Sequence, residues 1–219
     1  MKRFTALALI LIMSFLAVAC SPGPDNPSPS ATVKSPRPSG EYTEILLNDG
    51  QIETLLRVVW GFTGTADFDS SRGMNASNFE GFLSYYYGPF IEPAEDGAYG
   101  LVSIEEADKL MMNTFGLVFP FRTEKDEDAD PPQAIYADDG YYHIAVSKAP
   151  LYRFEFDSQE FIPDEELAST TDYDGTITVN LNAVLIEDDT IIGKAVLTLL
   201  PSGNDFGFIV STYQYLSNS

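Results

Sequence analysis

The residues best suited by type and spacing to bind or catalyse are the acids between positions 124 and 130. They are Glu124, Asp126, Glu127, Asp128 and Asp130, followed by Pro131 and Pro132. Carboxylates at alternate positions could surround a hard cation such as Ca²⁺. The segment lacks the glycine and the distal bidentate glutamate of a helix-loop-helix calcium site, and charges this dense are typical of a solvated loop. We call residues 124–130 the acidic loop and expect it to be solvated, with a cation-binding loop as the alternative.

Nucleophilic and metal chemistry have few candidate residues. The one histidine, His143, stands between Tyr142 and Ile144 in an alternating segment, so its ring is expected to face outward. A serine nucleophile needs a neighbouring base, and no Gly-x-Ser-x-Gly motif is present. One histidine and one cysteine are too few for a zinc site, and no phosphate-binding glycine loop or dinucleotide fingerprint occurs. The sequence therefore assigns no catalytic residue, which leaves the catalytic and ligand-binding residues unknown, and it predicts no metal ligand and no cofactor.

Tyrosines are the positive indication of a binding surface. Tyr85-Tyr86-Tyr87, Tyr141-Tyr142, Tyr213 and Tyr215 offer apolar rings with a hydroxyl at the edge, which suits sugars, peptides or another protein. Tyrosine is also favoured in strands, where it packs its ring inward and keeps its tip wet. Three consecutive residues of a helix point to different faces, so at least one of residues 85–87 should be exposed.

The only cysteine, Cys20, closes an export-type N-terminus. Lys2 and Arg3 precede an apolar run from Phe4 to Leu16, and small residues follow at 17–19. Residues 4–19 are shorter than the roughly 20 apolar residues that span a membrane, which favours a cleaved signal over a retained helix. A lone thiol would have no disulfide partner in an oxidising compartment.

The run Leu16-Ala17-Val18-Ala19-Cys20 resembles the lipobox of bacterial lipoproteins, although Ala17 stands where leucine is commoner. The resemblance implies that residues 1–19 are a signal peptide and that Cys20 receives a thioether-linked diacylglycerol as the new N-terminus. Two or more acyl chains hold a protein stably on a membrane, where one does not. The expected location is the outer face of the cell membrane. The chain resembles the small, uncharacterised lipoproteins of Gram-positive bacteria, a likeness that implies no activity.

The charge of the chain excludes one class of partner. Acidic residues number 33 and basic residues 12, for a net charge of −21, and loss of Lys2 and Arg3 with the signal would leave −23. Nucleic-acid binding needs lysine and arginine to replace counterions on phosphate, so no nucleic-acid partner is expected. An acidic surface is also repelled by anionic lipid. The expected membrane contact is therefore made through the lipid on Cys20.

Two further regions follow the signal. Residues 20–40 are rich in proline and serine and nearly devoid of apolar side chains, which predicts an extended tether of about 3.1 Å per residue. Residues 41–219 are long enough for a single domain with one core. Helical spacing of apolar residues predicts helices within 45–62, split at Gly50, and within 79–86, capped by Ser77 or Asn78. Ser103 and Glu106 form a capping-box pattern for a helix that ends at Gly116.

The second half of this domain alternates with a period of two. Alternating segments predict strands at 142–146, 152–157, 177–182, 191–200 and 206–216, with a short strand at 134–137 paired across the turn at 138–140. Helices followed by a meander predict an α+β fold in which the helices pack on one face of a five- to six-stranded antiparallel sheet. Cystatin-like and nuclear-transport-factor-like cones have this order, an analogy of fold that carries no function.

These observations favour a membrane-anchored extracytoplasmic lipoprotein whose domain is a non-enzymatic module that binds a peptide, a protein or a saccharide. One alternative is a hydrolase of envelope polysaccharide, which needs two carboxylates held at a fixed separation in a cleft. The sequence gives no such separation, so that alternative has no assigned residues. The other alternative is an interaction module stabilised by calcium at the acidic loop.

Overall fold

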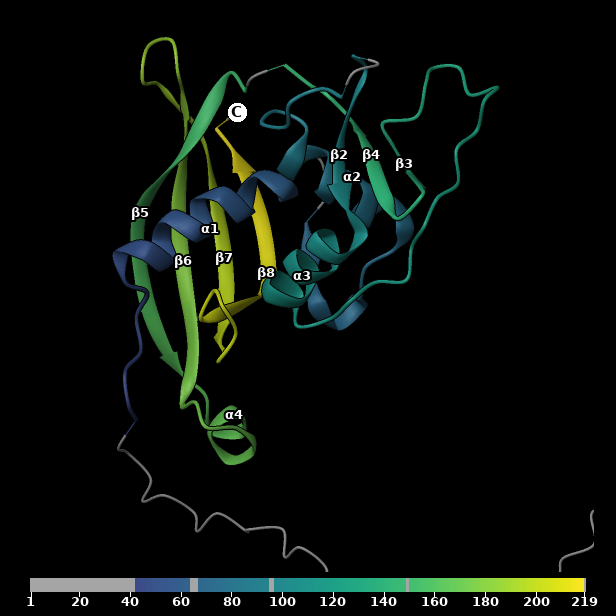
Figure 1. Cartoon of the computed structure of the whole chain (residues 1–219). Helices are drawn as coiled ribbons and strands as arrows, with labels where there is room; N and C mark the ends of the chain where they lie inside the picture. Colours follow the sequence, from purple (N-terminus) through teal and green to yellow (C-terminus); the bar gives the residue numbers. More distant parts are fainter. Residues whose placement is uncertain (1–41, 64–66, 95–96, 149, 219) are drawn as a thin grey trace, which may run out of the picture. The chain divides into compact units, whose positions relative to one another are not determined.

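The computed structural model describes residues 42–63, 67–94, 97–148 and 150–218. Within these ranges four α-helices accompany a five-stranded and a three-stranded antiparallel sheet (Figure 1). The predicted α+β class with a five-stranded antiparallel sheet is therefore confirmed. No helix among the described residues is long and apolar enough to cross a membrane. The predictions for the signal, Cys20 and the tether lie outside the described residues.

The larger sheet has the order β1-β8-β7-β6-β5. Its strands are β1 (Phe68–Asp69), β5 (Tyr152–Pro163), β6 (Gly175–Leu185), β7 (Ile191–Pro201) and β8 (Phe208–Ser217). Alternation decides which side chains enter the core: Ile177, Val179 and Leu181 are buried, whereas Thr178 and Asn180 are only partly buried. The alternating segments thus form the strands that they predict.

The first helix, α1 (Asp49–Phe62), begins with a reciprocal capping box. The Asn48 side chain accepts a hydrogen bond from the Gln51 backbone at 3.0 Å, and the Gln51 side chain accepts one from the Asn48 backbone at 3.0 Å. The predicted helix start at Gly50 is confirmed to within one residue, but the helix predicted before it is absent, because Asn48 caps α1 and residues 42–48 form no helix. Helix α2 (Ala76–Tyr87) is capped by Asn75 rather than by Ser77 or Asn78.

Helix α3 (Ile104–Phe115) confirms the predicted capping site. The Ser103 hydroxyl accepts a hydrogen bond from the Glu106 backbone at 3.1 Å, and Gly116 ends the helix in the left-handed region, with φ of 71°. Two short helices have no counterpart in the sequence predictions: the 3₁₀ turn η1 (Ser70–Arg72) and α4 (Glu165–Thr170).

The smaller sheet has the order β2-β4-β3 and consists of β2 (Tyr99–Ser103), β3 (Ile135–Asp138) and β4 (Tyr141–Ala145). The predicted hairpin between β3 and β4 is present, and its turn residues Asp139 and Gly140 both have positive φ. The hairpin does not extend the larger sheet, however. It pairs instead with β2, a strand absent from the sequence predictions.

The helices bring the two sheets together around one aromatic core. Helix α1 lies across the face of the larger sheet, and α2 lies between α1 and the smaller sheet (Figure 1). The Phe62 ring, at the end of α1, lies 5.1 Å from Phe82, 5.7 Å from Phe115 and 4.8 Å from Tyr213. A pocket lies where four element ends meet: the ends of α1, α2 and β4 and the start of β5.

Candidate functional site

A pocket of about 360 Å³ lies at this meeting point. Its size is at the lower end of the range for small-molecule sites. Its described lining comprises Trp60, Thr63, Ser84, Tyr85, Pro89, Ala134, Ala145, Val146, Ser147, Lys148, Pro150 and Tyr152. We call it the Trp60 pocket. Most of its wall is aromatic, aliphatic or proline surface, with a few hydroxyls and one amine.

Helix α1 supplies the tryptophan because its last turn ends beside β5. Thr63 caps the helix, and its hydroxyl donates to the Trp60 carbonyl oxygen at 2.8 Å. The Trp60 ring lies 5.2 Å from the Tyr152 ring and 5.4 Å from the Phe154 ring, so strand β5 supports it from one side. Phe90 supports it from another side, at 6.3 Å. The tryptophan is thus held in place before any ligand arrives.

The opposite wall depends on a close approach between α2 and the segment after β4. The Ser147 backbone donates to the Gly88 carbonyl oxygen at 3.0 Å. A Cβ atom on Gly88 would lie 2.5 Å from the Ser84 carbonyl oxygen and 3.1 Å from that of Ala145, so only glycine fits here. This contact places Ser84 and Tyr85, from the last turn of α2, beside Val146 and Ser147.

Tyr152 lines the pocket, Tyr213 lies close to it in the core, and both phenols stay neutral. Burial raises the pKa of Tyr152, and neighbouring Tyr215 raises it further, whereas a hydrogen bond with Thr63 lowers it. Burial also raises the pKa of Tyr213, which lies close to Tyr152. Neither hydroxyl ionises at physiological pH, because the ordinary tyrosine pKa is already about 10. Tyr152 therefore adds a ring and a hydroxyl to the pocket but no negative charge.

Two polar groups in the pocket have no partner in the part of the chain that is described. The Ser84 hydroxyl oxygen is buried and makes no hydrogen bond there. The exposed Lys148 makes no ion pair, hydrogen bond or ring contact with any described residue. An unpaired buried polar atom costs about 1–3 kcal/mol, so a ligand group or water that reached Ser84 would be stabilising. No carboxylate, histidine or cysteine is among the described residues of the wall.

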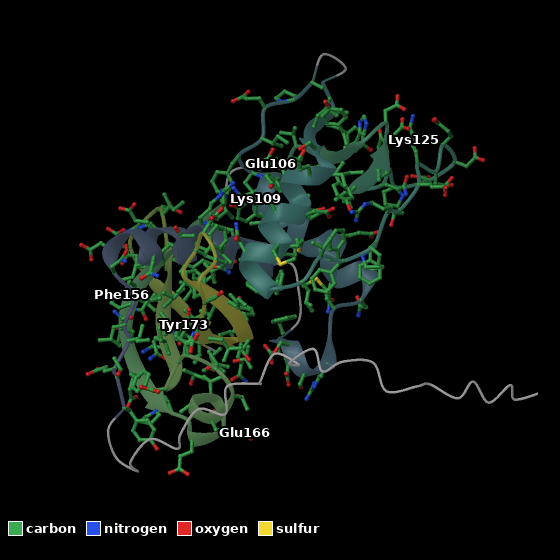
Figure 2. All side chains as sticks on the ribbon, turned by 60° about the horizontal axis from the view of Figure 1, so that its bottom comes forward. Glu106, Lys109, Lys125, Phe156, Glu166 and Tyr173 are labelled. Atoms are coloured by element: carbon green, nitrogen blue, oxygen red, sulfur yellow. The ribbon has the colours of Figure 1, made fainter. Side chains whose placement is uncertain are left out.

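The acidic loop makes hydrogen bonds and an ion pair within residues 124–130 and with Gln133. Lys125 forms an ion pair with Glu127 at 2.7 Å (Figure 2), and the Asp126 backbone donates to the Gln133 side chain at 2.7 Å. The Asp128 backbone donates to the Asp126 carboxylate at 3.0 Å. Among the described residues, no group of three or more histidines, cysteines or acids is placed to hold a metal ion. The loop thus shows hydrogen bonding typical of a solvated turn.

The arginine before the acidic loop anchors it to the domain. Arg122 donates to both oxygens of Asp108, at 2.8 and 3.0 Å, and to the carbonyl oxygens of Phe119 and Phe121. Its guanidinium carbon also lies 5.4 Å from the centre of the Tyr142 ring. A single cation therefore satisfies three acceptor groups and covers an aromatic face.

The other residues that the sequence singled out differ in how far they are exposed to solvent. His143 lies on the face of β4 opposite Ile144, as expected, but it is half-buried and stacks on Tyr136 at 4.5 Å. Tyr85 is 48% exposed, which confirms that one residue of 85–87 reaches the surface. Of the predicted tyrosine surface, only Tyr85 belongs to the described pocket wall. Tyr142 and Tyr213 are buried in the core instead.

Comparison with protein-family models, with curated proteins and with solved structures gives no significant match. The likeness to cystatin-like and nuclear-transport-factor-like folds therefore stays a prediction, and function has to be argued from the site.

Sequence reasoning missed most of the pocket. Trp60 and Tyr152 occupy core-facing positions in their periodic segments, and their ring contacts are those of core residues. Lys148 follows β4 in a short connection with no motif around it. The one available signal is the position of the single tryptophan at a helix end, because a large ring there extends past the region that the helix can bury.

Proposed function

We propose that this protein is a membrane-anchored extracytoplasmic lipoprotein whose domain binds a small ring-bearing ligand in the Trp60 pocket. Cys20 carries the lipid, residues 20–40 form the tether, and the domain acts on the outer face of the cell membrane. The proposed activity is binding rather than catalysis. The observation that carries the proposal is a pre-formed pocket walled by Trp60, Tyr85 and Tyr152.

The geometry of the wall supports ligand binding. Small-molecule sites are typically concave and mostly apolar, with a few polar groups that fix orientation. Trp60 is held by ring contacts on two sides, so little conformational entropy is lost when a ligand packs against it. Tyr85 and Val146 expose 48% and 39% of their surface at this site, which leaves apolar area for a ligand to cover. Aromatic rings, the apolar faces of sugar rings and aromatic peptide side chains can each pack against an aromatic wall.

Neither alternative function gains support from the described residues. A glycoside hydrolase needs two carboxylates that face each other across a cleft, and the described wall of the Trp60 pocket presents none. A calcium-stabilised module needs a convergent set of oxygen ligands, whereas the acidic loop uses its carboxylates in ion pairs and turns. Binding by the pocket is therefore the function we propose.

Membrane anchoring is tested by changing the one cysteine. We expect Cys20→Ser, expressed in a bacterial host with a lipoprotein-processing pathway, to leave the membrane pellet and appear in the soluble extracytoplasmic fraction. The control is Ser21→Ala, which leaves the thiol intact and should sediment with membranes. A Cys20→Ser protein that still sediments would contradict the proposed anchor.

Ligand binding is tested by a neutral ring probe, phenylacetamide, with the fluorescence of the single tryptophan as the readout. Ligand efficiency for so small a probe predicts a Kd of about 1 mM. Tyr85→Ala should weaken binding by about threefold to tenfold, since it removes one aromatic wall. Tyr141→Ala is the matched control, because Tyr141 is 45% exposed but does not line the pocket. Equal losses in the two variants, or no Trp60 response at all, would contradict the proposed site.

A further inference from the structure

The charges around the Trp60 pocket point to the class of its ligand. Eight basic residues lie within the described ranges, and six of them form ion pairs with carboxylates. One of these pairs joins Lys109, on α3 (Figure 2), to Asp205 at 2.9 Å. Arg57, the seventh, lies over the rings of Phe90 and Tyr86, at 3.6 and 4.7 Å. Lys148 is the eighth and has no such partner in the described residues.

A lysine without a partner among the described residues is unexpected in a chain of this composition. With 33 acidic and 12 basic residues, any surface lysine has many carboxylates available. Lys148 nevertheless stands at a pocket whose described wall has no carboxylate. The described wall residues are apolar or carry neutral hydroxyls, so no described wall residue neutralises its ammonium group.

We propose that the ligand of the Trp60 pocket is a small ring that bears a carboxylate or phosphate group, with the ring against Trp60 and the anion at Lys148. This inference rests on the proposed function of the pocket. The ammonium group offers three donors to an anionic oxygen, and hydrogen bonds between two charged groups are the stronger kind. The neutral phenol of Tyr152, in the pocket wall, adds no negative charge that would oppose such a ligand.

Aromatic walls by themselves would favour the opposite charge. A cation over the face of tryptophan or tyrosine is attracted by the ring, and an acidic domain attracts cations at long range. Long-range repulsion of an anion by surface carboxylates is screened beyond about 8 Å at physiological ionic strength. Lys148 acts at shorter range than this, so it determines the preference of a bound ligand. The charge of the ligand is therefore the property to test.

The test compares ligands that differ only in charge, with Trp60 fluorescence as the readout. The aromatic set is phenylacetate, phenylacetamide and 2-phenylethylammonium, and the saccharide set is glucuronate and glucose. We expect the anion of at least one set to bind about threefold to tenfold more tightly than its neutral analogue. That advantage should shrink as salt is added. The set in which it appears distinguishes an aromatic acid from an acidic sugar as the source of the anion.

Variants of the lysine show whether the preference comes from Lys148. Lys148→Met keeps an apolar stem and removes the charge, so it should abolish the advantage of the anion and bring the ratio of the two affinities to about one. Lys148→Arg should retain the advantage. Lys125→Met is the matched control, because Lys125 is also exposed but pairs with Glu127 away from the pocket.

The outcomes separate the two proposals. Neutral or cationic analogues that bind at least as tightly as the anions, with Tyr85→Ala still weakening them, would overturn the anionic ligand and leave the binding function standing. An anion preference that survives Lys148→Met would also overturn the inference. Absence of a Trp60 response to every probe at roughly 10 mM, ten times the expected Kd, would overturn both.

Discussion

The acidic loop and the Trp60 pocket differ in how far their polar groups are paired with other groups of the described chain. In the acidic loop, Lys125 pairs with Glu127 and the Asp126 carboxylate accepts a backbone hydrogen bond. In the pocket, Lys148 and the Ser84 hydroxyl have no partner among the described residues. The density of reactive side chains along the sequence therefore does not mark the candidate site. Groups that the fold leaves unsatisfied beside a cavity mark it better.

The largest expected effect is the loss of stability when Arg122, the anchor of the acidic loop, is removed. Arg122→Ala removes the hydrogen bonds to Asp108 and to two backbone carbonyl oxygens. Because the arginine is partly buried, we expect the free energy of unfolding to fall by about 2 kcal/mol, measured by urea denaturation. Binding of phenylacetamide should not change. Loss of binding without loss of stability would show that the loop belongs to the site.

Alkaline pH should produce an effect of comparable size, through a tyrosine that Arg122 contacts. Burial raises the pKa of Tyr142 to about 12, with Arg122 lowering it and Asp108 raising it, and its hydroxyl donates to the Phe121 carbonyl oxygen. The unfolded chain loses this proton near pH 10, so between pH 10 and 12 it binds fewer protons than the folded protein does. The free energy of unfolding should therefore fall as pH rises through this window, and Tyr142 should have no such effect below it.

The measurement for this window is urea denaturation at a series of pH values, for the wild-type protein and for Tyr142→Phe. The variant should show a shallower decline between pH 10 and 12, because one of the raised tyrosines is gone. An equal slope in both proteins would show that Tyr142 titrates normally in the folded state.

The smallest expected effect is the change in the free energy of unfolding when the pocket lysine or the loop lysine loses its charge. Lys148→Met and Lys125→Met each remove one exposed ammonium, and each should change the free energy of unfolding by less than about 0.5 kcal/mol. Urea denaturation of both variants checks this expectation. A loss above about 1 kcal/mol for Lys148→Met alone would indicate a structural partner for that lysine, contrary to its proposed role in binding.

Local signals in the sequence predicted much of the fold because they act over a few residues. The cap at Ser103, the stop at Gly116 and the turn at Asp139 and Gly140 each depend on backbone groups close in sequence. Alternation likewise predicted the four long strands, since one buried face requires it. Strand β2 and the separation of the smaller sheet depend on long-range pairing, which short windows do not encode.

The candidate site could not be predicted in the same way. Its wall is assembled from the ends of α1 and α2, the end of β4 and the start of β5, so no single segment carries a motif. Lys148 becomes informative only when the positions of all the carboxylates are known. Gly88, whose missing Cβ lets α2 approach Ser147, has no signature beyond the helix stop at Gly88-Pro89. Tyr85 is the exception, since helical geometry required exposure of one tyrosine there.

The central claim is that ligands enter the Trp60 pocket, and an NMR titration of the labelled domain with phenylacetate tests it most directly. Ligand entry should produce concentration-dependent shifts of the Trp60 indole N–H and of the backbone amides of Tyr85, Ser147 and Lys148. Amides of the acidic loop should remain still. Stationary Trp60 and Lys148 resonances, or shifts confined to residues 124–130, would contradict it.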